Sequence, residues 1–337
     1  MTVILTIIAA IVIFALLIFI HELGHFAVAK AVGIKVNEFA LGMGPALFKK
    51  QGKETLYSLR AFPIGGYCKM EGEDEESDHE RAFHNKPAWA RFLVVLAGPM
   101  MNFLGAIIIL SLMFTFIGSA TMFVGSLSND SPAYEAGIRE GDKVLTIDGA
   151  EAESWVVLQE EISGTTNETV TIEVERDGKE IEIVSGLTES EDGRQIVGMI
   201  PEYKRDFITS VKNGYSFSAS IVKEMLSFLG NLFTGQGSSA DVVGPIGIVS
   251  VVSDSVKNGF LNVTYLTALL SLNLGLINLL PFPALDGGRL LFILIRKITG
   301  KAITDEMEGR IHFMGMMFLI ALMIYVTFND VQTFILK

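Results

Sequence analysis

The feature that most limits how this chain can fold is a long apolar run close to its first residue. Residues 3–20 carry no charged side chain, and a helix of about 20 such residues crosses a hydrocarbon layer. The run exceeds the core of a cleavable signal peptide, so we expect it to remain as a span. It ends in three ionisable residues, His21, Glu22 and His25. Ionisable groups at membrane depth are costly and are by default functional, so a polar site is expected there.

The spacing H-E-x-x-H is typical of a metal site on a helix. Residues four apart share one helical face, so His21 and His25 can grip one Zn²⁺. The intervening Glu22 can act as general base on a metal-bound water, which ionises near pH ~7 and can attack an amide. The alternative is a metal-free polar cluster that pairs with other groups in a helical bundle.

The distribution of charge predicts a multi-span α-helical membrane protein. Half of the 337 residues are hydrophobic. Four segments are apolar and long enough to span: 3–27, 92–117, 263–285 and 311–328. Lys and Arg concentrate in the loops 28–91 and 286–310, which predicts that both loops are cytoplasmic. Residues 118–262 contain ten Lys or Arg against 23 Asp or Glu, and we expect this stretch and both termini to be extracytoplasmic.

The first cytoplasmic loop has β-strand character. Residues 34–41 and 55–70 are predicted strands of a membrane-associated sheet, with a turn at 52–54. The sheet is either a plain hairpin or lies beside the zinc site and receives an unwound substrate as an added strand. Residues 71–80 are strongly acidic and read as a solvated loop, and His79 and His84 read as surface histidines.

Residues 118–203 predict a small β-rich domain. Asp177-Gly178 between two alternating runs is a strong hairpin signal. The run A-G-I-x-x-G-D-x-V-x-x-I-D-G at 136–149 resembles bacterial PDZ domains, which bind peptides by strand addition. The domain either binds a peptide tail or acts as a size filter. Residues 204–262 predict amphipathic helices on the outer membrane surface, with 244–248 as a breaker.

A third ligand is expected from the far end of the chain, because a catalytic zinc takes three protein ligands and one open position. The third span breaks at Pro281 and Pro283, and Asp286 then follows at the depth of the histidines, near the cytoplasmic side. Asp286 is the best candidate; its alternative role is a helix cap beside two glycines.

Other polar residues in the spans leave more than one interpretation. Asn102 lies near the depth of the histidines and either ties helices together or binds substrate backbone. Glu306 and Glu308 would be the third ligand in another type of membrane metalloprotease. His312 reads as an interfacial residue rather than a ligand.

These motifs together resemble the bacterial site-2 protease family of the RseP/RasP type over essentially the whole chain. The resemblance rests on F-I-H-E-L-G-H-F at 19–26, G-P-x-x-N at 98–102, the PDZ-like run and N-L-L-P-x-P-x-L-D-G-G at 278–288. It implies a bacterial plasma-membrane zinc endopeptidase with one zinc per chain. The implied ligands are His21, His25 and Asp286, and the implied catalytic residue is Glu22. The positions implied in substrate handling, besides Asn102, are Asn273, Asn278, Pro281 and Pro283.

The resemblance also implies the substrates and the architecture. The expected substrates are single-span membrane proteins, such as anti-sigma factors already trimmed outside and remnant signal peptides; no nucleic acid is expected. Residues 1–117 and 263–337 would form the two halves of a protease core, with one PDZ-like domain where some members carry two. The alternative of another class is a non-catalytic membrane scaffold that presents a PDZ-like domain. One cysteine, Cys68, excludes an internal disulfide.

Overall fold

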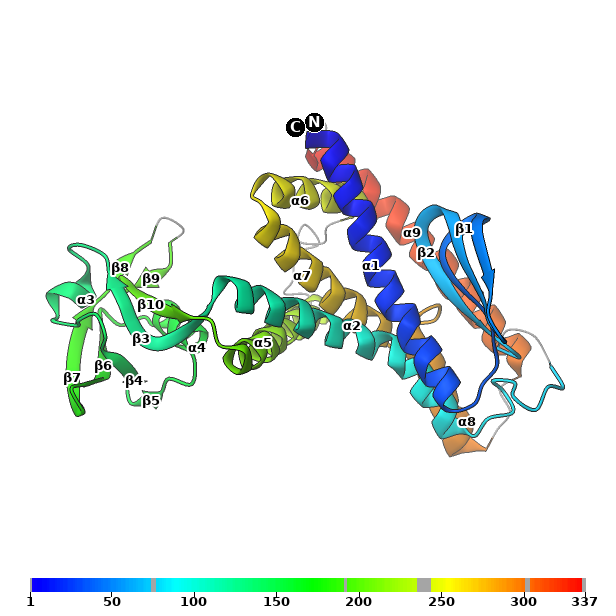
Figure 1. Ribbon diagram of the computed structural model, residues 1–337, viewed down its shortest axis with the longest axis horizontal. Helices are drawn as coiled ribbons and strands as arrows, with labels where there is room; N and C mark the ends of the chain where they lie inside the picture. The colour runs from blue at the N-terminus through cyan, green and yellow to red at the C-terminus, as the bar shows by residue number, and fades with distance from the viewer. Residues whose placement is uncertain (1, 74–76, 191–192, 235–243, 301–303, 335–337) are drawn as a thin grey trace. The chain divides into compact units, whose positions relative to one another are not determined.

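A computed structural model describes residues 2–73, 77–190, 193–234, 244–300 and 304–334 of the chain (Figure 1). It divides into two compact units. Unit 1 comprises residues 1–113 and 214–337, and unit 2 comprises residues 114–213.

Four helices in the described residues are long and apolar enough to cross a membrane. Three of them contain the whole of a predicted segment, namely α1 (Thr2–Ala31), α2 (Ala88–Ile117) and α9 (Asp305–Phe334). The fourth, α7 (Phe260–Leu279), contains most of the segment predicted at residues 263–285.

The third span is shorter than predicted, because α7 ends at Leu279 and not at residue 285. Leu280 already has extended backbone angles, as expected for a residue before Pro281. A proline also lacks the N–H that would continue the helix. A separate amphipathic helix, α8 (Asp286–Thr299), then starts at Asp286.

The predicted sheet forms from β1 (Val36–Gln51) and β2 (Leu56–Met70) and packs against α1 (Figure 1). Its register places residues 38–41 between two parts of β2, residues 56–59 and 66–69. Residues 48–51 pair in turn with 56–59. In the described chain, residues 66–69 are therefore one edge of the sheet and residues 48–51 the other.

Two further helices form in the region predicted as amphipathic, α5 (Phe207–Phe233) and α6 (Pro245–Lys257). The boundary between the units, at residues 213 and 214, falls within α5, and α6 belongs to unit 1. The predicted breaker at 244–248 is wrong, because Pro245 is the first residue of α6. Proline is well suited to the first helical position, and the Asp330 carboxylate of α9 accepts hydrogen bonds from the N–H groups of Gly244 and Gly247. Asp330 lies 86 residues after Gly244 and 83 residues after Gly247, so the local sequence does not reveal this cap.

Unit 2 is the predicted β-rich fold. Its main sheet has the order β10-β3-β4-β6-β7, with β5 paired to β4. Asp177 and Gly178 both have positive φ in the turn between β6 and β7, which confirms the hairpin. The strands are β3 (Ser119–Leu127), β4 (Lys143–Ile147), β5 (Ala150–Glu151), β6 (Thr169–Arg176), β7 (Lys179–Gly186), β8 (Thr188–Glu189), β9 (Gln195–Ile196) and β10 (Met199–Lys204), and the helices are α3 (Pro132–Glu135) and α4 (Trp155–Gly164).

The core of unit 2 forms from apolar residues at every second position of a strand and at helical spacing on a helix. Val170, Ile172 and Val174 alternate along β6 and are buried, while the residues between them face outward. Trp155, Leu158 and Ile162 repeat at helical spacing on α4 and join the same cluster. Unit 2 therefore has a hydrophobic core of its own.

Candidate metal centre

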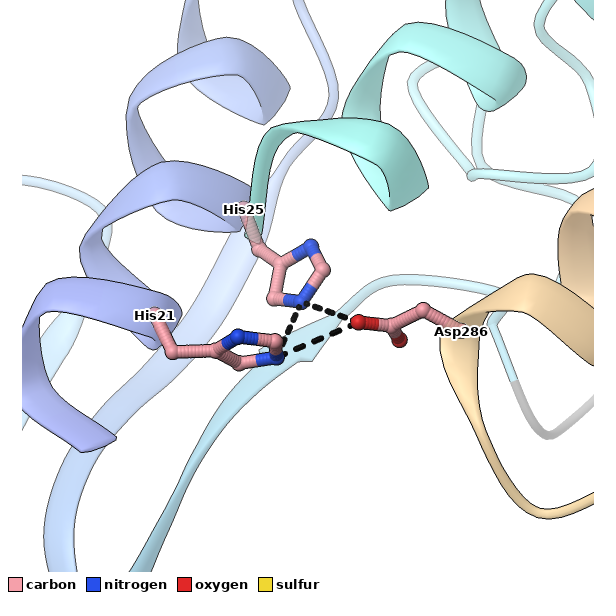
Figure 2. Close-up of side chains that lie close together, drawn as sticks. All are labelled: His21, His25 and Asp286. Carbon is pink, nitrogen blue, oxygen red and sulfur yellow. Dashed lines mark hydrogen bonds and ion pairs between the residues drawn. The ribbon is translucent and has the colours of Figure 1, made fainter. Parts of the chain in front are cut away.

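Three side chains from the two ends of the chain meet at one point in unit 1 (Figure 2). His21 and His25 project from one face of α1, and Asp286 projects from the first turn of α8. The two imidazole Nε2 atoms lie 3.2 Å apart. Asp286 Oδ2 lies 3.1 Å from the first and 3.5 Å from the second. The convergence predicted from sequence across 261 residues is present in the structure.

The opposite nitrogen of each ring is directed at α2. His25 Nδ1–H donates to the Val94 carbonyl at 2.8 Å, and this bond is buried. His21 Nδ1 lies 3.1 Å from the side-chain amide nitrogen of Asn102. When the nitrogen and oxygen of this amide exchange places, the His21 Nδ1–H donates to the amide oxygen, which is buried and otherwise lacks a hydrogen-bond partner. Both Nε2 atoms then present lone pairs to Asp286.

This donor set fits a zinc ion. Two unprotonated nitrogens and a carboxylate oxygen so close together repel one another unless a cation lies between them. Ligand bonds of about 2.0–2.2 Å in a tetrahedron place neighbouring donors about 3.3–3.5 Å apart. The observed edges of 3.1–3.5 Å match that triangle. Hydrogen bonds to the outer ring nitrogens are also the usual support of zinc-binding imidazoles.

A glycine on α2 makes room for the imidazoles. A Cβ built on Gly98 would lie 2.2 Å from His25 Nε2 and 2.9 Å from His21 Cε1. Gly24 on α1 is equally tight, since its Cβ would lie 2.3 Å from the Ala97 carbonyl oxygen. From the sequence, Gly98 stands out only as part of the G-P-x-x-N motif. No local pattern in α2 reveals which side chains Gly98 faces.

Glu22 lies next to the three donors, at the wall of a pocket of about 530 Å³ that also contains them. A Cβ built on Gly66 of β2 would lie 3.4 Å from Glu22 Cγ, and Cys68 of β2 lines the same pocket. Cys68 belongs to the edge segment of the sheet, so the sheet does lie beside the site. Phe26 reinforces this contact, with its ring 5.1 Å from that of Phe39 and 6.1 Å from that of Tyr57.

The lining of the pocket also includes Glu71, Glu73 and Ser77, which belong to the predicted solvated loop. Glu71 accepts hydrogen bonds from Ser77, Asn37 and Lys35, which hold the pKa of its carboxyl at about 2. Glu73 forms an ion pair with Arg289 of α8. These two acidic side chains are therefore structural, while residues 74–76 of the loop lie outside the described chain.

Other candidate residues lie away from the three donors. Asn273 and Asn278 are on α7, and Pro281 and Pro283 are in the turn before α8; the residues that line the pocket do not include them. Glu306 and Glu308, the alternative third ligands, pair instead with Arg310 and Arg296.

The remaining histidines and the cysteine are not donors of this centre either. His79 accepts from the Arg81 N–H, and His84 lies 2.9 Å from the Gly72 carbonyl. Cys68 lines the pocket, but among the described residues the donor atoms that lie within 4.8 Å of one another belong to His21, His25 and Asp286.

Comparison with known proteins finds a family match and several relatives that cover most of the chain. The model of peptidase family M50 matches residues 9–322. A Clostridium acetobutylicum protein is 38% identical over 329 residues, covering 96% of this chain and 97% of its own length. The regulator of sigma-W protease RasP of Bacillus subtilis is 31% identical over 414 residues, covering 97% and 98%. The zinc metalloprotease RasP of Bacillus licheniformis is 32% identical, covering 97% and 99%.

Part of the chain is also similar to a solved structure. The PDZ domain of an SdrC-like protein of Listeria innocua is 28% identical, covering 26% of this chain and 96% of that one, with a TM-score of 0.23. The family match and the relatives span nearly all of the sequence, including both parts of the metal centre. The chain therefore belongs to peptidase family M50 and is a bacterial membrane zinc metalloendopeptidase of the site-2 type.

Proposed function

We propose that this protein hydrolyses peptide bonds inside the membrane spans of single-span proteins, with one zinc held by His21, His25 and Asp286. The observation that carries the proposal is the meeting of these three donors beside Glu22, directly after the uncharged run 3–20 of α1. Bound there, zinc would polarise the scissile carbonyl and lower the pKa of a water to about 7.

Glu22 is proposed as the general base. It is the one carboxylate of the H-E-x-x-H turn, and it lines the pocket together with the three donors. Glu22 takes the proton of the attacking water and returns it to the leaving amine, which is the usual double role of such a group.

The sheet edge is proposed to hold the substrate. A helical span hides its amides in its own hydrogen bonds, so the substrate has to be extended before cleavage. Residues 66–69 pair on one side with β1, and Tyr67, Cys68 and Lys69 line the pocket. An extended peptide added to this edge would run past Glu22. Asn273, Asn278, Pro281 and Pro283 are proposed to guide the substrate span before it unwinds.

The proposed setting is the bacterial plasma membrane, with four spans and both termini outside. The basic loops support a position of the metal centre near the cytoplasmic face. The substrates would be anti-sigma factors already trimmed outside the membrane and remnant signal peptides. The Bacillus subtilis relative is named for regulation of sigma-W, which agrees with the first class.

The experiment that tests this function is Glu22→Gln. Glutamine keeps the shape but cannot accept the proton, so cleavage of a single-span substrate should fall about 10²–10⁴-fold while bound zinc stays unchanged. Glu306→Gln, a change of an exposed glutamate in the same unit, is the matched control and should cleave normally. Undiminished turnover by Glu22→Gln would remove Glu22 from the mechanism.

A further inference from the structure

The turn that delivers Asp286 to the imidazoles contains a conformation that its sequence disfavours. Ala284, two residues before Asp286, has φ +78°. The other described non-glycine residues with positive φ are Asp130, Asp148 and Asp177. An aspartate tolerates this region through local hydrogen bonds, but alanine has no side-chain group to do so. Something outside the turn must hold Ala284 in place.

The group that holds it is a histidine on α9. The Ala284 N–H donates to His312 Nδ1 at 2.8 Å. The ring must therefore carry its proton on Nε2. Glu308 favours this tautomer, because its Oε1 lies 3.8 Å from Nε2, and Arg296 of α8 binds the same carboxylate at 2.6 Å.

The face of α9 that carries His312 also packs closely against the turn at residues 282–284. Gly315 lies three residues after His312, and a Cβ there would be 2.5 Å from the Pro283 carbonyl oxygen. Phe318 lies three residues further, and its ring is 5.6 Å from that of Phe282. Positions 312, 315 and 318 form one helical stripe, so α9 contacts the turn at three successive points.

The start of α8 depends on the same geometry. Gly287 and Gly288 directly follow Asp286, and Cβ atoms on them would lie 2.1 Å from the Leu280 oxygen and 2.4 Å from the Phe282 oxygen. The turn is thus folded tightly over the first residues of α8. A change in the Ala284 backbone would therefore shift Asp286, because the close contacts of Gly287 and Gly288 leave no room for the turn to adjust on its own.

We propose that His312 is a positioning residue for the metal centre. By accepting the Ala284 N–H it holds the left-handed turn, and the turn aims the Asp286 carboxylate at His21 and His25. His312 touches neither substrate nor metal; it acts through the backbone on zinc affinity. The inference rests on the proposed role of Asp286 as a ligand.

The test compares variants that differ in one hydrogen-bond acceptor. His312→Leu fills similar space without an acceptor and should lower zinc affinity about tenfold, the lower end of the range for groups that support metal ligands. His312→Asn can offer its amide oxygen to the same N–H and should stay within about threefold of the parent. Zinc affinity is measured on the purified full-length protein by competition with a chromophoric chelator. Arg310→Gln, at an exposed position one half-turn away, is the matched control and should leave affinity unchanged.

A second change separates this role from ordinary packing. Glycine adopts positive φ without strain, so Ala284→Gly should remove the need for the acceptor. In that background His312→Leu should cost less than about twofold in zinc affinity. If His312→Leu binds zinc like the parent, or if Ala284→Gly fails to rescue it, the proposal is overturned. Asp286→Ala, measured in parallel, tells this failure apart from failure of the ligand assignment itself.

Discussion

Asn102 joins three helices at the level of the metal centre. Its side chain is directed at His21 of α1, and its backbone carbonyl accepts a hydrogen bond from Ser271 Oγ of α7 at 2.8 Å. The residue is fully buried. Sequence reasoning allowed either helix packing or contact with substrate backbone. In the structure the side chain lies against an imidazole, which favours a role in orienting His21.

Replacing Asn102 with leucine tests that role. The variant leaves His21 Nδ1 without its partner, and we expect zinc affinity to fall about 10–100-fold in a chelator competition. The KM for a single-span substrate at saturating zinc should change little. Asn262→Leu, which alters an exposed asparagine on α7, is the control. Normal zinc affinity with a raised KM would instead make Asn102 a substrate-binding residue.

At this scale the sequence predicts the donors better than their surroundings. His21, Glu22 and His25 are found by spacing alone, because a helix puts residues four apart on one face. Gly98, Val94 and His312 contact the centre or its turn from other helices. Their roles depend on which faces of the helices meet, and no local pattern in the sequence records that.

At the scale of elements, the two edges of the small sheet differ in what they face. Residues 66–69 line the pocket beside Glu22, whereas residues 48–51 form the opposite edge. Both edges carry a lysine, Lys69 and Lys49. A substrate bound by strand addition next to the metal centre would therefore contact one edge and not the other.

Photo-crosslinking distinguishes the edges. In a Glu22→Gln background, which holds the substrate uncut, a photoreactive residue at Lys69 should crosslink a single-span substrate several-fold more than one at Lys49. Both positions lie in the same sheet and carry the same side chain, so each controls for the other. Equal or reversed yields would exclude strand addition at residues 66–69.

The existence and type of the helices and strands were more predictable than their ends. The apolar runs and the Asp177-Gly178 turn act through local physics, and the structure confirms them. The end of α7 was placed six residues too late, although Pro281 marked it. The start of α6 was missed because its cap, Asp330, comes from a distant helix.

At the scale of the whole molecule, the chain combines two compact units with separate cores. Unit 2 has its own buried cluster, and its two boundaries with unit 1 fall near residues 113 and 214. A unit of this kind can be removed without opening the core of the rest. Sequence composition predicted a separate β-rich domain here, but not whether it binds a peptide tail or excludes large substrates.

Deletion of residues 120–200 addresses that choice. If unit 2 excludes substrates with bulky outer domains, the deletion should allow cleavage of an untrimmed substrate that the full chain leaves intact. An unrelated folded domain of similar size, inserted at the same place, should restore the exclusion. A deletion variant that still requires trimming would oppose a size filter, and a failed restoration would favour peptide binding.

The central claim is that His21, His25 and Asp286 bind one zinc. The most direct measurement is the zinc content of purified full-length protein after dialysis against a moderate chelator, for the parent and for Asp286→Ala. We predict about one zinc per chain in the parent and a small fraction of that in the variant, with the fold intact by circular dichroism. Equal zinc content in the two proteins would contradict the claim.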